Sequence, residues 1–265
     1  MSELSSKRQN RRDISSSQLN SQSFQTQSSN KPFDFLEFVF KPRRIFKYLI
    51  AIIFCLVILN LIGIFYQYGL NGAEEGIGRL IPLFILNSEA SIPSIYSSFA
   101  LLVCSVLLAI ITKSKYQQKN RYHRYWKFLA LVFLCLAIDE AVSIHELTEG
   151  ISRKVVNNDG FLYYAWVIPA IILFSLFSLI YLKFVLSLPK KTRFLFILSA
   201  ATFMVGAVGV EMIGGKIVTL QGENNLIYAL TATVEETLEM VGIAAFIYAL
   251  LDYIEKYIKP VIVYF

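Results

Sequence analysis

Long blocks of apolar residues, separated by shorter polar connections, dominate the sequence from residue 47 onward. An α-helix needs roughly 20 apolar residues to cross a bilayer, and six blocks approach that length. These blocks lie at 47–68, 94–112, 125–146, 162–185, 193–213 and 226–252. The pattern therefore predicts an all-α fold, a polytopic transmembrane helix bundle with six spans.

The first 46 residues follow a different pattern. Residues 1–32 are rich in Ser, Gln and Asn and poor in large apolar side chains, so they cannot bury enough surface to fold. We expect a disordered cytoplasmic tail there. Residues 33–46 mix Phe with basic residues, which predicts an amphipathic segment at the membrane interface. The six-helix transmembrane domain is then expected over 47–265.

Composition agrees with a membrane protein. Hydrophobic residues make up 55% of the chain and charged residues only 17%, whereas a soluble domain carries roughly 25% charged residues. The net charge of +6 comes from basic clusters beside the apolar blocks, at Lys7–Arg12, Lys41–Lys47, Lys113–Arg124 and Lys183–Arg193. The sequence contains no separate basic domain that would bind nucleic acid. Membrane lipids are therefore the expected partners.

The connections between the blocks alternate in charge. Those around 113–124 and 186–193 are basic, whereas 69–93, 147–161 and 214–225 are not. Basic loops remain on the cytoplasmic side of a membrane, so the alternation predicts that both termini are cytoplasmic. We expect the membrane to be a bacterial plasma membrane.

Ionisable residues gather in one layer of this predicted bundle. They are Asp139, Glu140, His145 and Glu146 at the end of the third block, Glu211 in the fifth, and Glu235, Glu236 and Glu239 in the sixth. In the predicted topology they all lie in the outer half of the membrane. A charged side chain at the centre of a span costs on the order of 2.5–3.5 kcal/mol, so we expect them to face the bundle interior.

Helical spacing sharpens this expectation. Residues three, four and seven apart share a face of a helix, so Asp139, Ser143 and Glu146 are expected on one face of the third span. By the same rule Glu235 and Glu239 share a face of the sixth span.

The fifth span carries small residues beside its carboxyl group. Gly206, Ala207 and Gly209 precede Glu211, and small side chains let membrane helices approach one another closely. We therefore expect the fifth span to pack tightly against a neighbour near Glu211. The connection to the sixth span is expected to begin at Gly214.

Several carboxyl groups in one space of low dielectric constant cannot all remain charged without help. Either some of them hold protons, or a cation neutralises them. Carboxylates suit Mg²⁺, Ca²⁺ and Mn²⁺, and one imidazole would also admit Fe²⁺ or Zn²⁺. The candidate ligands of a divalent metal ion are Asp139, Glu140, His145, Glu235 and Glu239.

Three functions fit this layer, and the sequence leaves them open. The first is the binding or translocation of a cation, either a proton or a divalent metal ion. The second is an integral membrane enzyme, a hydrolase or transferase that uses a metal or a carboxyl group on a lipid-type substrate. The third is an accessory membrane subunit whose polar layer is purely structural. Six spans are few for a transporter, so translocation would favour a homo-oligomer or a membrane complex.

No short motif identifies a reaction or a catalytic residue. The sequence lacks H-E-x-x-H, a Gly-rich phosphate loop and G-x-S-x-G. His123 and His145 fall on opposite sides of the predicted bundle, which argues against a histidine-rich zinc site. The inner halves of the third and sixth spans, 128–136 and 241–251, are apolar, which argues against a continuous route through the membrane.

The predicted topology places residues 147–161 outside the cell. In a variant without the native cysteines, Asn158→Cys should react with a membrane-impermeant thiol reagent added to intact cells, because this connection lies among the non-basic ones. Labelling that occurs only after lysis would reverse the predicted orientation.

Overall fold

The computed structural model describes residues 41–69, 81–88, 91–143 and 159–258. The expected disordered tail, most of the expected interfacial segment, His145 and Glu146 lie outside these ranges. The described residues belong to one compact unit, Lys41–Phe265, and they contain helices but no strand. The all-helical class predicted from the sequence is therefore confirmed.

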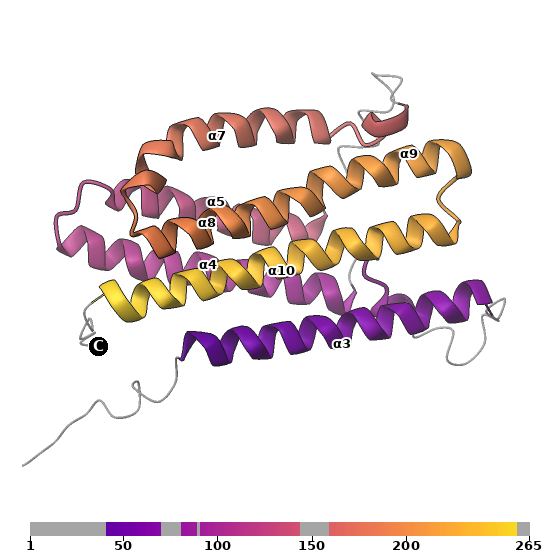
Figure 1. The fold of residues 1–265 in the computed structure, drawn as a ribbon, viewed down its shortest axis with the longest axis horizontal. Coiled ribbons are helices and arrows are strands. Elements are labelled where there is room, and N and C mark those ends of the chain that lie inside the picture. The colour runs from indigo at the N-terminus through magenta and orange to yellow at the C-terminus, as the bar shows by residue number, and fades with distance from the viewer. Residues whose placement is uncertain (1–40, 70–80, 89–90, 144–158, 259–265) are drawn as a thin grey trace, which may run out of the picture. The chain divides into compact units, whose positions relative to one another are not determined.

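The main helices run in the following order (Figure 1). They are α3 (Pro42–Gly69), α4 (Ile92–Gln117), α5 (His123–Val142), α7 (Val167–Ser187), α8 (Lys190–Met204), α9 (Glu211–Gln221) and α10 (Leu226–Tyr257), with a short 3₁₀ helix η2 (Gly160–Leu162) before α7 and a π-helix η3 (Val205–Val210) between α8 and α9. Together α8, η3 and α9 form one continuous helical segment, Lys190–Gln221.

Five helices in the described part of the chain are long and apolar enough to cross a membrane. They are Pro42–Gly69, Ile92–Gln117, Val167–Ser187, Lys190–Gln221 and Leu226–Tyr257. The remaining expected span corresponds to α5, which also carries Arg124, Lys127, Asp139 and Glu140 in its 20 residues. The helices thus fit an integral membrane protein, while the number of spans and their orientation stay predictions.

Helix α10 lies at the centre of the bundle, packed against α3, α4, α8, η3 and α9 (Figure 1). In its most apolar stretch 61% of the residues are buried within the protein, compared with 11% for α7. The exposed side chains of α7 are mostly Leu and Ile, as expected of a helix that faces lipid. The side chains of α10 therefore lie at the centre of a core that α4, α5, α7 and α8 complete.

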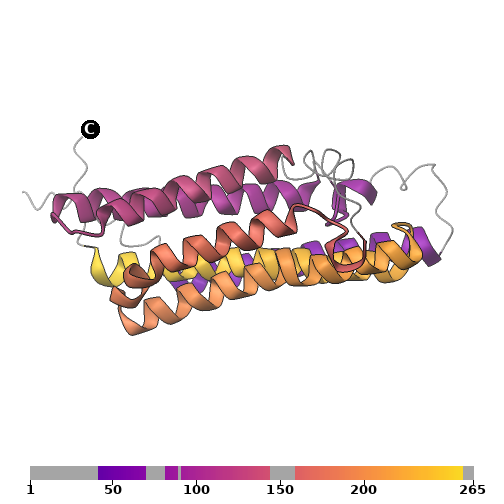
Figure 2. The same ribbon diagram turned by 90° about the horizontal axis from the view of Figure 1, so that it is seen from above.

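Helices α4 and α5 form a close antiparallel pair, which Figure 2 shows side by side. Two serine hydroxyls of α4 hold the pair together: Ser98 donates to the Ala137 carbonyl and Ser105 to the Ala130 carbonyl, each at 2.8 Å. Hydroxyl groups commonly link membrane helices in this way, because lipid offers them no other partner.

Aromatic pairs connect α5 to α10 at a spacing of seven residues. Trp126 packs on Tyr253 with ring centroids 5.0 Å apart, and Phe133 stacks on Phe246 at 4.6 Å. Seven residues make about two turns of an α-helix, so the two helices keep one antiparallel register along their length.

One end of the bundle is strongly basic. There the ends of α4, α8 and α10 meet: Lys115 lies over the Tyr253 ring, while Lys191 and Lys256 bind Asp252 at 2.6 and 2.9 Å. Arg43, Arg44, Lys47, Lys113, Lys119, Arg121, Arg124, Lys127, Lys183, Lys190 and Arg193 also belong to the helix ends and turns at this end. The three basic clusters that lie in the described residues, Lys41–Lys47, Lys113–Arg124 and Lys183–Arg193, thus gather at one end of the bundle.

Several helix boundaries differ from the sequence prediction, and two of these differences lie close to the predicted acidic residues. The connection expected from Gly214 is wrong, because the helix continues to Gln221. Gly214 and Gly215 are buried against aromatic side chains, and a side-chain carbon at Gly215 would lie 2.9 Å from Tyr163 Cβ. The third span is shorter than expected, because α5 ends at Val142 and Ser143 takes a left-handed backbone conformation with φ 50°.

Glycines allow the Lys190–Gln221 segment to approach α10. A side-chain carbon at Gly242 would lie 2.8 Å from the Phe203 backbone nitrogen, closer than such atoms can pack. Gly206 is equally restricted by α10, whereas a carbon at Gly209 would meet only Val205 Cγ1, at 4.0 Å. The expected close contact is therefore confirmed at Gly206 and is wrong at Gly209.

Gly242→Ala should destabilise the bundle by about 1–3 kcal/mol, because the added methyl group must push the α8 backbone away from α10. Gly209→Ala is the matched control, since the same added atom has space there. Thermal unfolding of both variants in detergent measures the difference. Equal melting temperatures would show that α8 and α10 do not approach this closely.

Candidate functional site

The π-helix η3 lies directly before Glu211 and determines which way this residue faces. A π-helix bonds residues five apart, so residues i and i+5 lie on the same side of it. Gly206 precedes Glu211 by five residues, and its α-carbon lies against α10. A side-chain carbon at Gly206 would be 2.8 Å from the Glu235 carbonyl oxygen and 3.1 Å from Glu239 Cγ. The π turn therefore directs Glu211 toward the same part of α10.

Glu235 of α10 meets Glu211, and the two carboxyl groups lie within hydrogen-bonding reach of each other. The charges of Glu239 and Glu236 also act on Glu235. All four side chains are partly buried. An ionised carboxylate only accepts hydrogen bonds, so a hydrogen bond between two carboxyl groups requires that one of them hold a proton.

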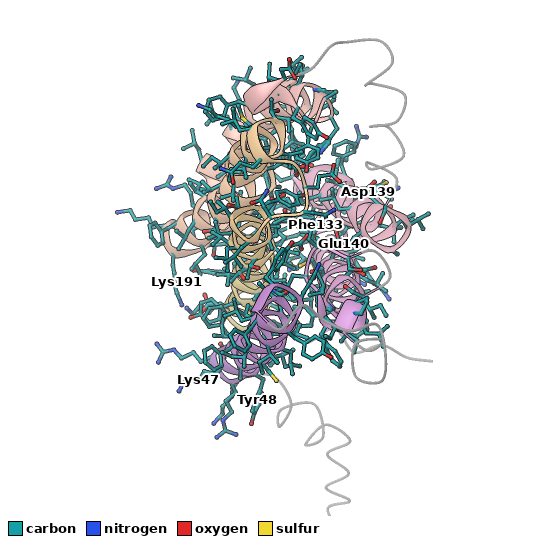
Figure 3. The ribbon with its side chains drawn as sticks, turned by 90° about the vertical axis from the view of Figure 1, so that its right-hand side faces the viewer. Lys47, Tyr48, Phe133, Asp139, Glu140 and Lys191 are labelled. Carbon is teal, nitrogen blue, oxygen red and sulfur yellow. The ribbon has the colours of Figure 1, made fainter. Side chains whose placement is uncertain are left out.

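Helix α5 contributes Glu140. Glu140 lies seven residues after Phe133 on α5, and Glu239 lies seven residues before Phe246 on α10. Because the two helices are antiparallel, the two glutamates are expected opposite each other, two turns from the Phe133–Phe246 contact. The charges that act on Glu239 in the described part of the chain are those of Glu236, Glu140 and Glu211. Figure 3 looks along the bundle and labels Glu140 and its neighbour Asp139 on α5.

The structure thus unites most of the residues expected from the sequence. Glu140, Glu211, Glu235, Glu236 and Glu239 come together from α5, the Lys190–Gln221 segment and α10. We call these five residues the carboxyl cluster. Asp139 is partly buried, but within the described ranges it is not among the groups whose charge acts on Glu235 or Glu239.

The helical face expected for Asp139, Ser143 and Glu146 is interrupted at Ser143, whose left-handed conformation ends α5. Glu146 lies outside the described residues, so its place beside Asp139 stays a prediction. Within the described ranges, no three His, Cys, Asp or Glu side chains are arranged to hold a metal ion. The expected ligand His145 lies outside those ranges, so the complete ligand set stays a prediction.

A buried amide, which the sequence prediction missed, lies on another side of α10. Asn60 of α3 is 1% exposed, donates to Thr233 Oγ1 at 2.8 Å and accepts from the Leu86 backbone N–H at 3.0 Å. These bonds join α3, α10 and the segment before α4. The sequence signal was a lone amide inside an apolar span, which is costly unless it is hydrogen-bonded.

Hydroxyl groups, also missed, lie between the carboxyl cluster and the end of the bundle opposite the basic one. Tyr228 of α10 is hydrogen-bonded to Tyr164 at 2.8 Å between hydroxyl oxygens, and Asn87 donates to the Tyr228 hydroxyl at 3.2 Å. The charges of Glu235 and Glu211 act on Tyr228. Tyrosines near a span end resemble interfacial anchors in the sequence, so the pattern gave no reason to link them to the carboxyl groups.

Comparison with known proteins identifies a family. A family model described as "Domain of unknown function (DUF8692)" matches residues 49–253. The chain belongs to this family. The match extends from α3 to the last turns of α10 and so includes the whole carboxyl cluster. No curated protein and no solved structure matches the chain.

Glu239→Gln should stabilise the protein at alkaline pH, by on the order of 1 kcal/mol, because it removes one of several like charges. The gain should shrink at mildly acidic pH, where the carboxyl groups hold protons and no longer repel each other. Melting temperatures in detergent at the two pH values test this. Glu255→Gln, at an exposed position near the basic end of α10, is the control. A Glu239→Gln variant that is less stable at both pH values would show that a cation or a donor compensates the Glu239 charge.

Proposed function

We propose that this protein is an integral membrane protein that binds a proton at the carboxyl cluster, with the Glu211–Glu235 pair as the binding site. The observation that carries the proposal is the approach of these two carboxyl groups to hydrogen-bonding reach, from separate helices. The pair holds one proton between two oxygen-bearing groups. Glu140, Glu236 and Glu239 surround the pair with further acidic groups and so set how firmly it holds the proton.

A proton suits this arrangement better than a divalent metal ion. Metal ions such as Ca²⁺ take about 6–8 oxygen ligands at short distances, whereas a proton needs only two acceptors in line. The described residues bring two carboxyl groups within hydrogen-bonding reach and do not set three ligand side chains around one point. The cluster also lies in a partly buried place, where unshared negative charges are costly.

Binding fits the described residues better than translocation. Between Glu239 and Tyr248, the buried residues of α10 are Met240, Gly242, Ile243, Ala244, Phe246 and Ile247. This stretch covers roughly 13 Å along the helix at ~1.5 Å per residue, and these side chains offer no titratable group for a proton. We therefore propose that the site exchanges protons with one side of the membrane.

Infrared spectroscopy of the purified protein tests the proposal. A protonated carboxyl group has a carbonyl stretching band that an ionised carboxylate lacks. The wild-type band should be present at neutral pH, shift in D₂O and disappear as the pH is raised. It should be lost in Glu235→Gln and in Glu211→Gln, because either change removes one of the two groups that share the proton.

Glu255→Gln is again the matched control, and it should leave the band unchanged. A band that persists in both cluster variants would place the proton elsewhere and overturn the proposal. A band that never titrates would favour the purely structural polar layer. Stoichiometric Mg²⁺, Mn²⁺ or Zn²⁺ in the wild-type protein, lost in Glu235→Gln, would assign the site to a metal ion.

A further inference from the structure

The α10 face that carries Glu235 also carries other polar groups. Tyr228, Thr231 and Glu235 follow one another at spacings of three and four residues, which places them in one row on the helix. Gly214 of α9 packs against this row. A side-chain carbon at Gly214 would lie 3.6 Å from Tyr228 Cε2 and 4.0 Å from Thr231 Cγ2.

The row continues beyond α10. The Tyr228 hydroxyl is hydrogen-bonded to the Tyr164 hydroxyl at 2.8 Å, and Asn87 donates to it at 3.2 Å. Tyr164 precedes α7, close to η2, and Asn87 lies between α3 and α4. Polar groups from two other parts of the chain therefore converge on Tyr228 at the end of the bundle away from the basic helix ends.

From Tyr228 the row leads to the proposed proton site. Tyr228 and Glu235 are separated by roughly 10 Å along the helix at ~1.5 Å per residue. The Thr231 hydroxyl lies between them and donates to the Ile227 carbonyl at 2.8 Å. The charges of Glu235 and Glu211 both act on Tyr228, so the hydroxyl and the carboxyl pair are electrostatically linked.

We propose that the hydroxyl groups of Tyr164, Tyr228 and Thr231 form the route by which protons reach the Glu211–Glu235 pair, along the contact between α9 and α10. This proposal rests on the proton-binding function proposed above. Protons would then reach the pair through uncharged hydroxyl groups, from the end of the bundle away from the basic helix ends.

The transfer conserves protons at each step. A hydronium ion in the outer water gives its proton to the first hydroxyl, which passes its own proton along the hydrogen bond to the next. Between Tyr228 and Glu235 the route runs through water and the Thr231 hydroxyl, which turns its O–H from the Ile227 carbonyl toward the next acceptor as it receives a proton from the water before it. At the end, one carboxylate of the pair has become a carboxylic acid, one hydronium has become water, and every hydroxyl carries one proton as before.

Exchange kinetics of the full-length protein in detergent test the route. The protein is diluted rapidly from H₂O into D₂O, and the shift of the carbonyl stretching band of the Glu211–Glu235 pair is followed in time. Tyr228→Phe should slow this shift by about tenfold or more, because a positioned proton donor is lost while the ring remains. The final band position should equal that of the wild type, since the pair itself is intact.

Tyr181→Phe is the matched control, because the Tyr181 hydroxyl is also hydrogen-bonded, to the Tyr125 carbonyl at 2.9 Å, but near the basic end. It should exchange at the wild-type rate. Tyr164→Phe and Thr231→Val should each slow the exchange as well, and they carry the test if Tyr228→Phe does not fold.

The outcomes distinguish a failure of the route from a failure of the proposed function. If the band depends on Glu235 but all three route variants exchange at the wild-type rate, protons arrive elsewhere and only the route is overturned. Faster exchange in Tyr228→Phe would mean that the hydroxyl closes the site, which also overturns the route. A band that survives Glu235→Gln removes the proton site, and the route with it.

Discussion

A carboxyl group cannot lie against lipid at an acceptable cost, and this constraint determines how the helices are arranged. Helix α10 carries three glutamates within five residues, from Glu235 to Glu239, and it occupies the centre of the bundle. The other helices surround it and shield these side chains. The long, nearly featureless α7 can remain at the periphery because it carries no such group near its middle.

Close helix contact near the carboxyl cluster comes from missing side chains. Two glycines let the Lys190–Gln221 segment approach the backbone of α10: Gly206, which lies against Glu235 and Glu239, and Gly242 of α10, which lies against Phe203. Toward the basic end the same helix pair is held by charge, through Lys191 and Asp252. The contact between α5 and α10 changes in the same way. Aromatic rings pack together toward the basic end, and Glu140 approaches Glu239 farther from it. Each of these neighbours of α10 is therefore packed by apolar or paired groups at one end and by polar groups at the other.

Much of this arrangement was visible in the sequence, because it depends on composition and regular spacing. Apolar length predicted the helices, and the cost of burying charge predicted that Glu140, Glu211, Glu235, Glu236 and Glu239 would face inward together. The proximity of Glu140 to Glu239 also has a counterpart in the sequence. Phe133 lies seven residues before Glu140, and its partner Phe246 lies seven residues after Glu239.

Other features depend on tertiary contacts that a linear pattern does not contain. The hydrogen bonds of Asn60 and Tyr228 join segments that are far apart in the chain. The helix across Gly214 and Gly215 was missed because glycine normally suggests a break, while here aromatic side chains fill the space beside it. The left-handed Ser143 has no glycine or asparagine to announce it, so the early end of α5 was missed too.

The π-helix makes the site depend on how the helix is wound. A π turn is equivalent to one extra residue in an α-helix, and each residue turns the rest of the helix by about 100° around the axis. Winding Val205–Val210 as regular α-helix, with no residue lost, would turn the whole of α9 by about 100° relative to α8. Glu211 would then point away from Glu235 although no polar side chain had changed. Deleting the exposed Gly209, which touches little, would instead remove the extra residue together with the π turn and so leave α9 in its present orientation. The winding of the helix is thus as much a part of this site as the identity of its acids.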